Sequence, residues 1–269
     1  MSATALLERF IEETPATLGC RRCRDGEQFP LAIRMAFQPI VDSADGSIFA
    51  YEALVRGPAG EGAAAVLGQV GPSQLYAFDQ SCRLAAIQAA ARLGMTARLS
   101  INFLPNAVYE PAACIRVTLA AADRYRFPAE RLMFELSEQE RVVSVDHTLA
   151  IMRDYERRGF TLAIDDFGAG YSGLGLLAEF QPHVLKLDMA LVRGVDESPA
   201  RQAIIAGVVQ TGAALGCRIL AEGVETAAEV RTLHALGIRL FQGYWFARPA
   251  LEALPAIEPQ ALELLDALR

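Results

Sequence analysis

Short apolar runs alternate with longer segments of helical periodicity between about residue 31 and about residue 245. Brief apolar runs bounded by turn residues predict buried strands, and apolar positions spaced three and four apart predict helices. Eight such runs occur, at 35–41, 48–55, 98–103, 131–136, 160–165, 183–188, 218–222 and 239–242. The predicted helices between the later runs include 76–93, 145–158, 200–215 and 226–236.

The residues between these segments indicate how the elements are connected. Asp45-Gly46 predicts a hairpin between the first two strands, so that one of them runs antiparallel. A glycine that can adopt the left-handed conformation follows several predicted helices, at positions 94, 159, 216 and 237. Repeated strand–helix units with buried parallel strands predict an α/β fold, either a closed barrel or an open doubly wound sheet. Eight strands within about 210 residues favour the barrel.

Composition narrows the class of protein. The chain has 269 residues, of which 52% are hydrophobic and 21% charged, which excludes a disordered, collagen-like or coiled-coil chain. We predict a short polar N-terminal extension at 1–30 and one barrel domain at 31–269, which includes a closing helix over the apolar pattern 251–268. The net charge of −7 argues against a broad basic surface, so we expect no DNA or RNA partner. No segment has the length of a membrane span and no signal peptide is evident, so we expect a cytoplasmic protein without a membrane partner.

The five cysteines are widely scattered, unlike a secreted disulfide framework. Cys20 and Cys23 form a C-x-x-C pair in the extension, where reduced surface thiols are favoured over half a zinc site or a redox pair. The other three lie in apolar surroundings typical of core residues: Cys82, Cys114 and Cys217.

Nearly every apolar run carries a polar side chain near its C-terminal end, which is costly unless the group is paired or binds a metal. In a (β/α) barrel these strand ends converge on one mouth, where the chemistry is found. Any one such acid is more often an ordinary loop residue, but seven strands that deliver eight polar groups to one rim predict a functional site. The eight residues are Glu52, Asn102, Glu135, Asp165, Asp166, Lys186, Glu222 and Gln242.

The charges at this rim indicate which cofactor could bind. Five carboxylates and one lysine leave four negative charges, which two divalent cations would neutralise. Oxygen ligands suit Mg²⁺ or Mn²⁺ better than Zn²⁺. The three histidines lie outside the rim and form no paired motif, so a histidine-built zinc site is disfavoured. Adjacent Asp165 and Asp166 could bridge and flank two ions about 3.5–4 Å apart, the arrangement used for phosphoryl displacement.

An ordered set of motifs over about residues 31–250 resembles the EAL family of cyclic-di-GMP phosphodiesterases. The matching segments are FQPI at 37–40, EALVRG at 52–57, IN at 101–102, FELSE at 134–138, IDDFGAGYS at 164–172, LKLD at 185–188, AEGVET at 221–226 and QGYWF at 242–246. The resemblance implies a modified TIM (β/α)8 barrel with one antiparallel strand. It also implies hydrolysis of one phosphodiester bond of cyclic di-GMP to linear pGpG, with two Mg²⁺ or Mn²⁺ ions.

The resemblance carries roles over to the matching positions. The first metal would be held by Glu52, Asn102, Glu135 and Asp165, and the second by Asp165, Asp166 and Glu222. Glu52, Glu222, Lys186 and Gln242 would act in catalysis, where Lys186 orients or deprotonates the attacking water. Substrate contacts would come from Arg56, Gln38 and Gln242. Loop positions around the site would be Glu138, Gly168 and Glu225, and family members often form a homodimer through the loop and helix after Asp166.

Three departures from the family pattern concern the loops, namely Leu104, Ala169 and Gly173. The altered loop at Ala169 and Gly173 motivates a second hypothesis, a cyclic-di-GMP receptor or regulatory module with weak catalysis. All the metal ligands are retained, which favours the enzyme.

Two further motifs have competing interpretations. Gly168 to Gly173 with Asp188 resembles a dinucleotide fingerprint of a nicotinamide- or flavin-linked enzyme, but the preceding Asp165 and Asp166 would repel a pyrophosphate. The aromatic segment 244–246 could line a guanine pocket or pack the barrel against its last helix, and the sequence leaves both open.

Overall fold

The computed structural model describes residues 29, 31–108, 110–137, 144–170 and 173–269. Its strands are β1 Arg34–Asp42, β2 Ser47–Arg56, β3 Arg98–Asn102, β4 Leu132–Ser137, β5 Thr161–Phe167, β6 Val184–Leu187, β7 Arg218–Ala221, β8 Leu240–Phe241 and β9 Ala250–Leu251. Its α-helices are α3 Ala63–Leu67, α4 Leu75–Arg92, α5 Pro111–Tyr125, α6 Val145–Arg157, α7 Gly173–Glu179, α8 Met189–Val192, α9 Pro199–Leu215, α10 Ala227–Ala235 and α11 Pro259–Leu268. Short 3₁₀ turns lie at Pro72–Gln74, Pro105–Ala107, Ala129–Arg131 and Val195–Glu197.

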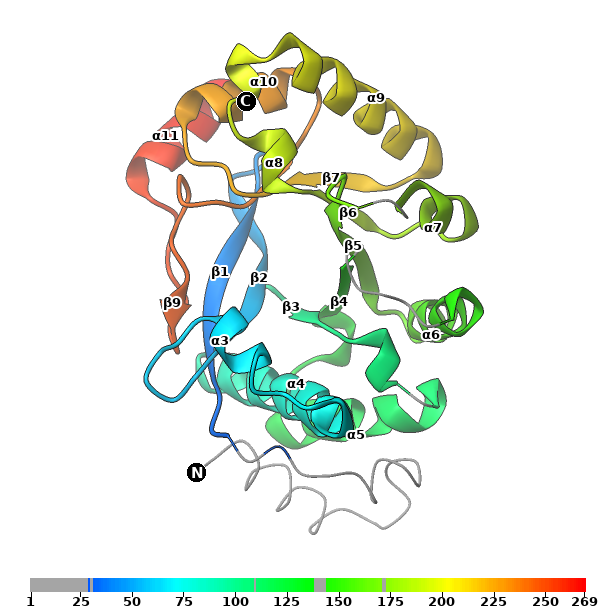
Figure 1. Cartoon of the computed structure of the whole chain (residues 1–269). Coiled ribbons are helices and arrows are strands. Elements are labelled where there is room, and N and C mark those ends of the chain that lie inside the picture. The colour runs from blue at the N-terminus through cyan, green and yellow to red at the C-terminus, as the bar shows by residue number, and fades with distance from the viewer. Residues whose placement is uncertain (1–28, 30, 109, 138–143, 171–172) are drawn as a thin grey trace.

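The sheet closes on itself, and the helices surround it (Figure 1). Strands β2 to β8 follow one another in parallel, and β1 completes the barrel between β8 and β2. β1 is antiparallel to both neighbours, as the hairpin signal predicted, and Gly46 in the turn has φ +75°. The prediction of a barrel with one antiparallel strand is therefore confirmed, and the open doubly wound sheet is excluded.

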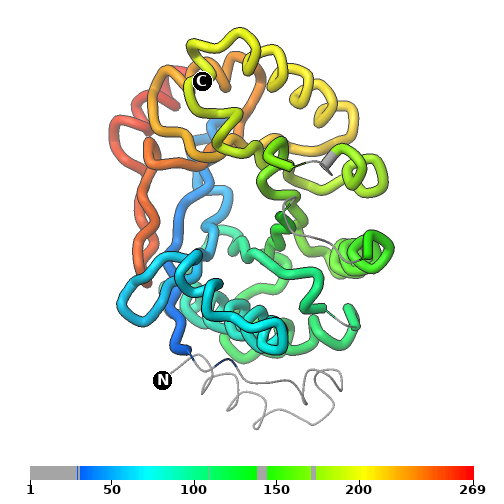
Figure 2. Tube along the Cα trace, viewed as in Figure 1, coloured from blue at the N-terminus to red at the C-terminus, as the bar shows by residue number. Residues whose placement is uncertain are grey.

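The C-terminal segment differs from the prediction of one helix over 251–268. Residues Ala250–Leu251 form β9, which pairs with Ala36 and Phe37 of β1 (Figure 2). The last helix begins only at Pro259. Pro255 lacks an amide hydrogen and would disrupt a helix interior, whereas Pro259 occupies the first turn, where no amide donor is needed.

Inside the barrel, an apolar layer lies below a polar layer. One cluster of buried side chains comprises Ile40, Ala50, Met133, Ala163, Val184, Leu220 and Leu240. Alternate strand residues point to the same face, so the residue two positions nearer the mouth also points inward. Those residues are Gln38, Glu52, Glu135, Asp165, Lys186, Glu222 and Gln242. On β1 the mouth-side residue Gln38 comes before the deeper residue Ile40 in the sequence, because this strand runs antiparallel to the others.

Outside the barrel, the helices end as the glycines predicted. Gly94, Gly159, Gly216 and Gly237 all have positive φ after α4, α6, α9 and α10. Cys114 and Cys217 are buried and Cys82 is half-buried, in keeping with core positions. The extension with Cys20 and Cys23 lies outside the described residues. Among the helices that are described, none combines the length and hydropathy needed to cross a membrane.

Candidate metal centre at the barrel mouth

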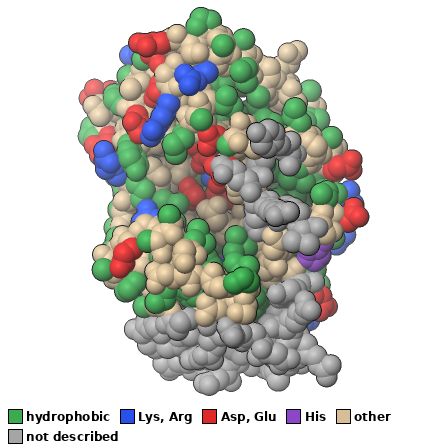
Figure 3. Space-filling view, viewed as in Figure 1, with side chains coloured by type: hydrophobic (Ala, Val, Ile, Leu, Met, Phe, Trp, Pro, Cys, Tyr) green, Lys and Arg blue, Asp and Glu red, His purple; other side chains and the backbone are tan. Residues whose placement is uncertain are grey.

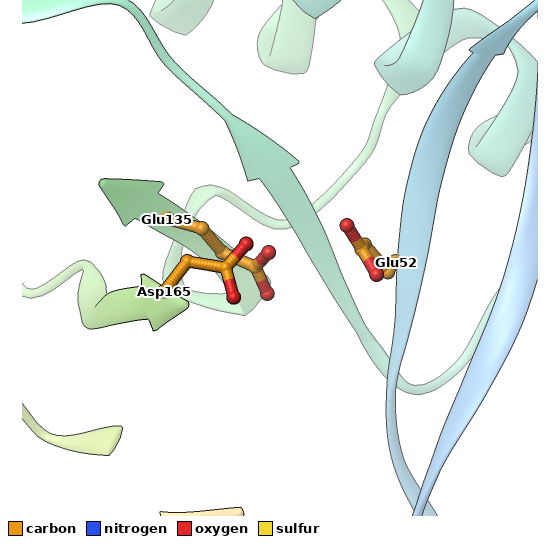
Figure 4. Close-up of side chains that lie close together, drawn as sticks. All are labelled: Glu52, Glu135 and Asp165. Carbon is orange, nitrogen blue, oxygen red and sulfur yellow. The ribbon is translucent and has the colours of Figure 1, made fainter. Parts of the chain in front are cut away.

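Acidic side chains gather in a hollow on the face of the molecule shown in Figure 3. One group is Glu52, Glu135 and Asp165, and a second is Asp165, Asp166 and Glu222. Within each group, one carboxylate oxygen from each residue lies within 4.8 Å of those from the other two. Glu135 and Asp165 approach each other from neighbouring strands, and Glu52 faces them from β2 (Figure 4). These two groups match the carboxylates of the two predicted ligand sets, which share Asp165.

Lys186 lies at the centre of both groups. Its side chain is fully buried, and its Nζ atom lies 2.7 Å from Glu135, 3.0 Å from Asp165 and 2.8 Å from Glu222. Lys186 is also the only lysine in the chain, in which all other basic side chains are arginine or histidine. An ammonium is a compact charge that three carboxylates can surround, whereas a planar guanidinium cannot occupy the same space. The one lysine of the chain thus occupies a position where three carboxylates surround its ammonium.

Amide side chains complete the part of the site around Glu52. Asn102 Nδ2 donates to Glu52 Oε1 at 2.9 Å, and Gln242 Nε2 donates to Glu52 Oε2 at 2.6 Å. Gln242 also donates to Gln38 Oε1, and Gln38 donates to the Ala247 carbonyl. Sequence reasoning named Gln38, Glu52, Asn102 and Gln242, and the structure brings all four together.

Two serines that the sequence analysis missed orient metal-site carboxylates. Ser100 donates to Glu135 Oε1 at 2.5 Å, and Ser137 donates to Asp166 Oδ2 at 3.0 Å. Each lies two residues from a predicted ligand on the same strand, so strand alternation could have identified both. Asp166 itself has φ +57°, a left-handed conformation that is uncommon outside glycine and asparagine.

Burial and repulsion among these acids shift their pKa values. Burial, with repulsion from Glu52 and Asp165, raises the pKa of Glu135 to about 8 despite the attraction of Lys186. Burial likewise raises the pKa of Glu222 well above its usual range. Burial disfavours the ammonium of Lys186, but Asp165, Glu135 and Glu222 outweigh it and raise the lysine pKa. One lysine cannot neutralise this many acids, so the site favours additional positive charge.

The donor set fits divalent cations. The two groups offer carboxylate oxygens, and the Asn102 amide reaches the first group through Glu52. Oε1 of Gln242 is buried and accepts no hydrogen bond from any described residue. Oxygen-only ligands are those preferred by Mg²⁺ and Mn²⁺.

A cavity of about 270 Å³ opens above the carboxylates. Its outer rim includes Arg193, which pairs with Glu225 at 2.5 Å and was not predicted. Asp188 and Tyr244 also line this cavity. Arg193 follows β6 at the same end of the barrel as the clustered carboxylates, which is the signal that could have identified it.

Residues of the aromatic segment 244–246 have different surroundings, so one fits a ligand pocket and another fits packing of the barrel. Tyr244 is 47% exposed at the cavity, and the Arg248 guanidinium lies 4.3 Å from its ring centroid. Phe246 is fully buried and stacks on Phe241 with a centroid distance of 5.8 Å. Tyr244 is therefore available to a ligand, whereas Phe246 packs the barrel.

The remaining predicted site residues lie at the edge of the site. Arg56 ends β2 and donates to the Val55 carbonyl, and it does not line the acidic cavity. Gly168 has φ +97° in the loop after β5. Glu138 lies outside the described residues. The glycine loop therefore follows the fifth strand of a closed barrel, and not the first strand of an open dinucleotide-binding sheet.

The fold and the site together define a modified (β/α)8 barrel protein with a carboxylate-rich centre suited to divalent cations. Residues 31–249 match the family model of the EAL domain, and the chain therefore belongs to the EAL domain family. This confirms the family resemblance of the motifs and the predicted class of fold.

Among curated proteins, the chain is 32% identical over 223 residues to the blue light- and temperature-regulated antirepressor BluF of Escherichia coli, covering 82% of this chain and 55% of BluF. It is 34% identical over 169 residues to the cyclic di-GMP phosphodiesterase RocR of Pseudomonas aeruginosa, covering 63% of this chain and 43% of RocR. The chain thus spans about half the length of these curated relatives.

Among solved structures, the chain is similar to a standalone versatile EAL protein from Vibrio cholerae O395 in its c-di-GMP bound form. The identity is 50%, the TM-score is 0.84, and the match covers 87% of this chain and 98% of that one. A manganese and cyclic-diGMP complex of Klebsiella pneumoniae BlrP1 matches with 34% identity and a TM-score of 0.79, covering 91% of this chain and 61% of BlrP1.

Proposed function

We propose that this chain hydrolyses one phosphodiester bond of cyclic di-GMP to give linear pGpG, with two Mg²⁺ or Mn²⁺ ions as cofactors. The observation that carries the proposal is the pair of carboxylate groups that share Asp165. The names of its relatives support the substrate, since RocR is a cyclic di-GMP phosphodiesterase and the Vibrio EAL protein was solved with c-di-GMP bound.

The metal ligands would be divided between two ions. Glu52, Asn102, Glu135 and Asp165 would hold the first ion, and Asp165, Asp166 and Glu222 the second. Bound there, the cations would acidify water and stabilise the negative charge that develops on the phosphodiester.

The other side chains would act on the water and the substrate. Lys186 orients the attacking water and offsets carboxylate charge from the centre of the site. Gln242 lines the cavity and would contact the water from there, while its Nε2 remains bonded to Glu52. Ser100 and Ser137 keep Glu135 and Asp166 in the orientations that ligation needs.

Substrate recognition would use the rim of the cavity. Gln38 lies beside Gln242 on the cavity wall and can contact the substrate. We also propose a phosphate contact for Arg56, whose planar guanidinium suits that ligand and could reach it by leaving the Val55 carbonyl.

The assembly of the chain is part of the same proposal. We propose that residues 31–269 form one barrel domain. Two copies of the chain would form a homodimer through the loop and helix after Asp166, and the protein would act in the cytoplasm. Light scattering of the purified protein tests the dimer, and a monomer at micromolar concentration would contradict it.

Incubation of the purified chain with cyclic di-GMP tests the activity. Chromatography should show pGpG in Mg²⁺ or Mn²⁺ and intact substrate in EDTA. A chain that leaves the substrate intact in both metals is not a phosphodiesterase.

A second candidate function is a cyclic-di-GMP receptor with weak catalysis. The observation that favours it is the similarity to BluF, an antirepressor. In the same incubation, tight binding of cyclic di-GMP without pGpG in saturating Mn²⁺ would support the receptor and exclude the enzyme.

A further inference from the structure

A second fully buried charge network lies on the outer side of the barrel wall. Arg83 Nε lies 2.8 Å from Asp79 Oδ2, one turn earlier on α4, and both side chains are 1% exposed. Arg83 Nη1 donates to the hydroxyl of Tyr155 on α6 at 2.9 Å. A buried ion pair contributes little net stability compared with apolar residues of the same volume. Its presence here therefore calls for a role other than stability.

The network contacts the neighbours of two first-metal ligands. Asp79 Oδ1 accepts the amide hydrogen of Leu104 at 3.0 Å, two residues after Asn102. The Arg83 guanidinium lies 5.7 Å from the ring centroid of Phe103 and 5.3 Å from that of Phe134.

Phe103 follows Asn102 and Phe134 precedes Glu135, so a single cation contacts residues adjacent to both ligands. The Phe103 amide also donates to the Glu135 carbonyl at 3.1 Å. The ends of β3 and β4 are thus held together behind the first metal group.

Beside the buried ring of Phe103, which packs on Phe134 and Tyr155, a pocket lies between the end of β3 and α4. A cavity of about 310 Å³ lies there, with Phe78, Cys82, Asn102 and Leu104 among its lining residues. This pocket is partly open to solvent, so the Asp79 to Leu104 hydrogen bond supplies a directional contact on the side of the strand end that faces the pocket.

We propose that the Asp79–Arg83 pair is a positioning device for the first metal group, which fixes Asn102 and Glu135 through the Leu104 amide and the two phenyl rings. The proposal rests on the two-metal site of the proposed function, but it concerns metal affinity and does not require hydrolysis. It predicts an effect confined to the first group, because within the described part of the chain no hydrogen bond or ion pair joins Asp79 or Arg83 to Asp166 or Glu222, the two members found only in the second group.

The test separates the two groups before perturbing the pair. In an Asp166→Asn background, Mn²⁺ titration by calorimetry or electron paramagnetic resonance reports the first group. In a Glu135→Gln background, the same Mn²⁺ titration reports binding to the second group. The double substitution Asp79→Leu with Arg83→Met removes both charges and the acceptor for Leu104, and Asp79→Asn with Arg83→Met removes the charges but keeps an acceptor.

We expect Asp79→Leu with Arg83→Met to weaken Mn²⁺ binding to the first group by about tenfold or more. Binding to the second group should change by less than about threefold, well below that effect. The Asn-containing pair should restore most of the first-group affinity, and Cys82→Ala on the same helix should leave both groups unchanged. Circular dichroism and thermal unfolding establish that each variant is folded; Asp79→Ala with Arg83→Met replaces the leucine variant if that one does not fold.

Equal weakening of both groups, unchanged affinity in a folded leucine or alanine variant, or no rescue by asparagine would each overturn the proposal. Failure of cyclic di-GMP hydrolysis in the unmodified chain would contradict the proposed function, yet it would leave this Mn²⁺ comparison intact.

Discussion

The Nζ atom of Lys186 lies 2.7 Å from Oε2 of Glu135, and neither side chain has any exposure to solvent. Asp165 and Glu222 contact the same ammonium. The protonation of each of these three acids therefore depends on the charge of the other two. The chain places its one lysine where the density of carboxylates is highest. The protonation of the metal-free site can therefore be followed at a single atom.

Lysine labelled with ¹⁵N should give a single side-chain signal that reports Lys186. We expect the pKa of Lys186 in metal-free protein to lie above its ordinary value, because the carboxylate attraction exceeds the effect of burial. Titration of the ¹⁵Nζ shift with pH measures it. A midpoint below that of free lysine would show that desolvation dominates.

Metal stoichiometry should distinguish the two adjacent aspartates. Asp165 belongs to both carboxylate groups and Asp166 to one, so Asp165→Asn should weaken both Mn²⁺ sites and Asp166→Asn only one. Calorimetry should detect one remaining tight site in Asp166→Asn and none in Asp165→Asn. Hydrolysis should fall at least about 100-fold in both, because even residues that only orient metal ligands contribute 10–100-fold to metal affinity or activity. Two intact sites in Asp165→Asn would contradict the shared role.

The stability of the metal-free protein should fall as pH rises from about 4.5 toward 8. The pKa of Glu135 is raised to about 8 in the folded state, so the folded chain binds more protons than the unfolded chain across this window. The stabilising contribution of protonated Glu135 is fully present below the unfolded pKa and is lost as pH passes the folded one. Thermal unfolding in EDTA measures this decline.

Glu135→Gln provides the control for that measurement, since glutamine cannot ionise. The variant should show a flatter dependence of melting temperature on pH, and saturating Mn²⁺ should flatten that of the unmodified chain. A decline of equal slope in Glu135→Gln would assign the effect to another group.

The loop after β5 should tolerate a methyl group poorly at Gly168. This residue has φ +97°, and an added Cβ would lie 2.5 Å from Leu191 Cδ1. We expect Gly168→Ala to lower the free energy of unfolding by about 1–2 kcal/mol. It should also reduce hydrolysis, since the loop begins beside Asp166.

Gly175→Ala is the matched control, because it lies in α7 with nothing within 4 Å of the added Cβ. It should stabilise the protein by about 0.5–1 kcal/mol through helix propensity. Denaturant unfolding measures both variants, and equal stability of the two would contradict the strain argument.

Local patterns in the sequence determined eight of the nine strands that the described residues form, the class of fold and most of the residues of the candidate metal centre. Side chains alternate between the two faces of a strand, so a polar residue two positions beyond an inward-facing residue also points inward, as Asp165 does beyond Ala163. This direction does not depend on the neighbouring strands. The hairpin at Asp45-Gly46 likewise depends on two residues and predicted that one of the first two strands is antiparallel, which the structure assigns to β1. Such features can be predicted because their cause lies within a few bonds of the chain.

Contacts between strands and helices were decided only by the tertiary structure. The register that sets Asn102 opposite Glu135, the three acids around Lys186, and the hydrogen bond from Leu104 to Asp79 each join segments far apart in sequence. The burial of Phe246 beside the exposure of Tyr244 depends equally on how the last turn meets the barrel. Barrel closure brings these groups together, and no periodicity within one segment contains that information.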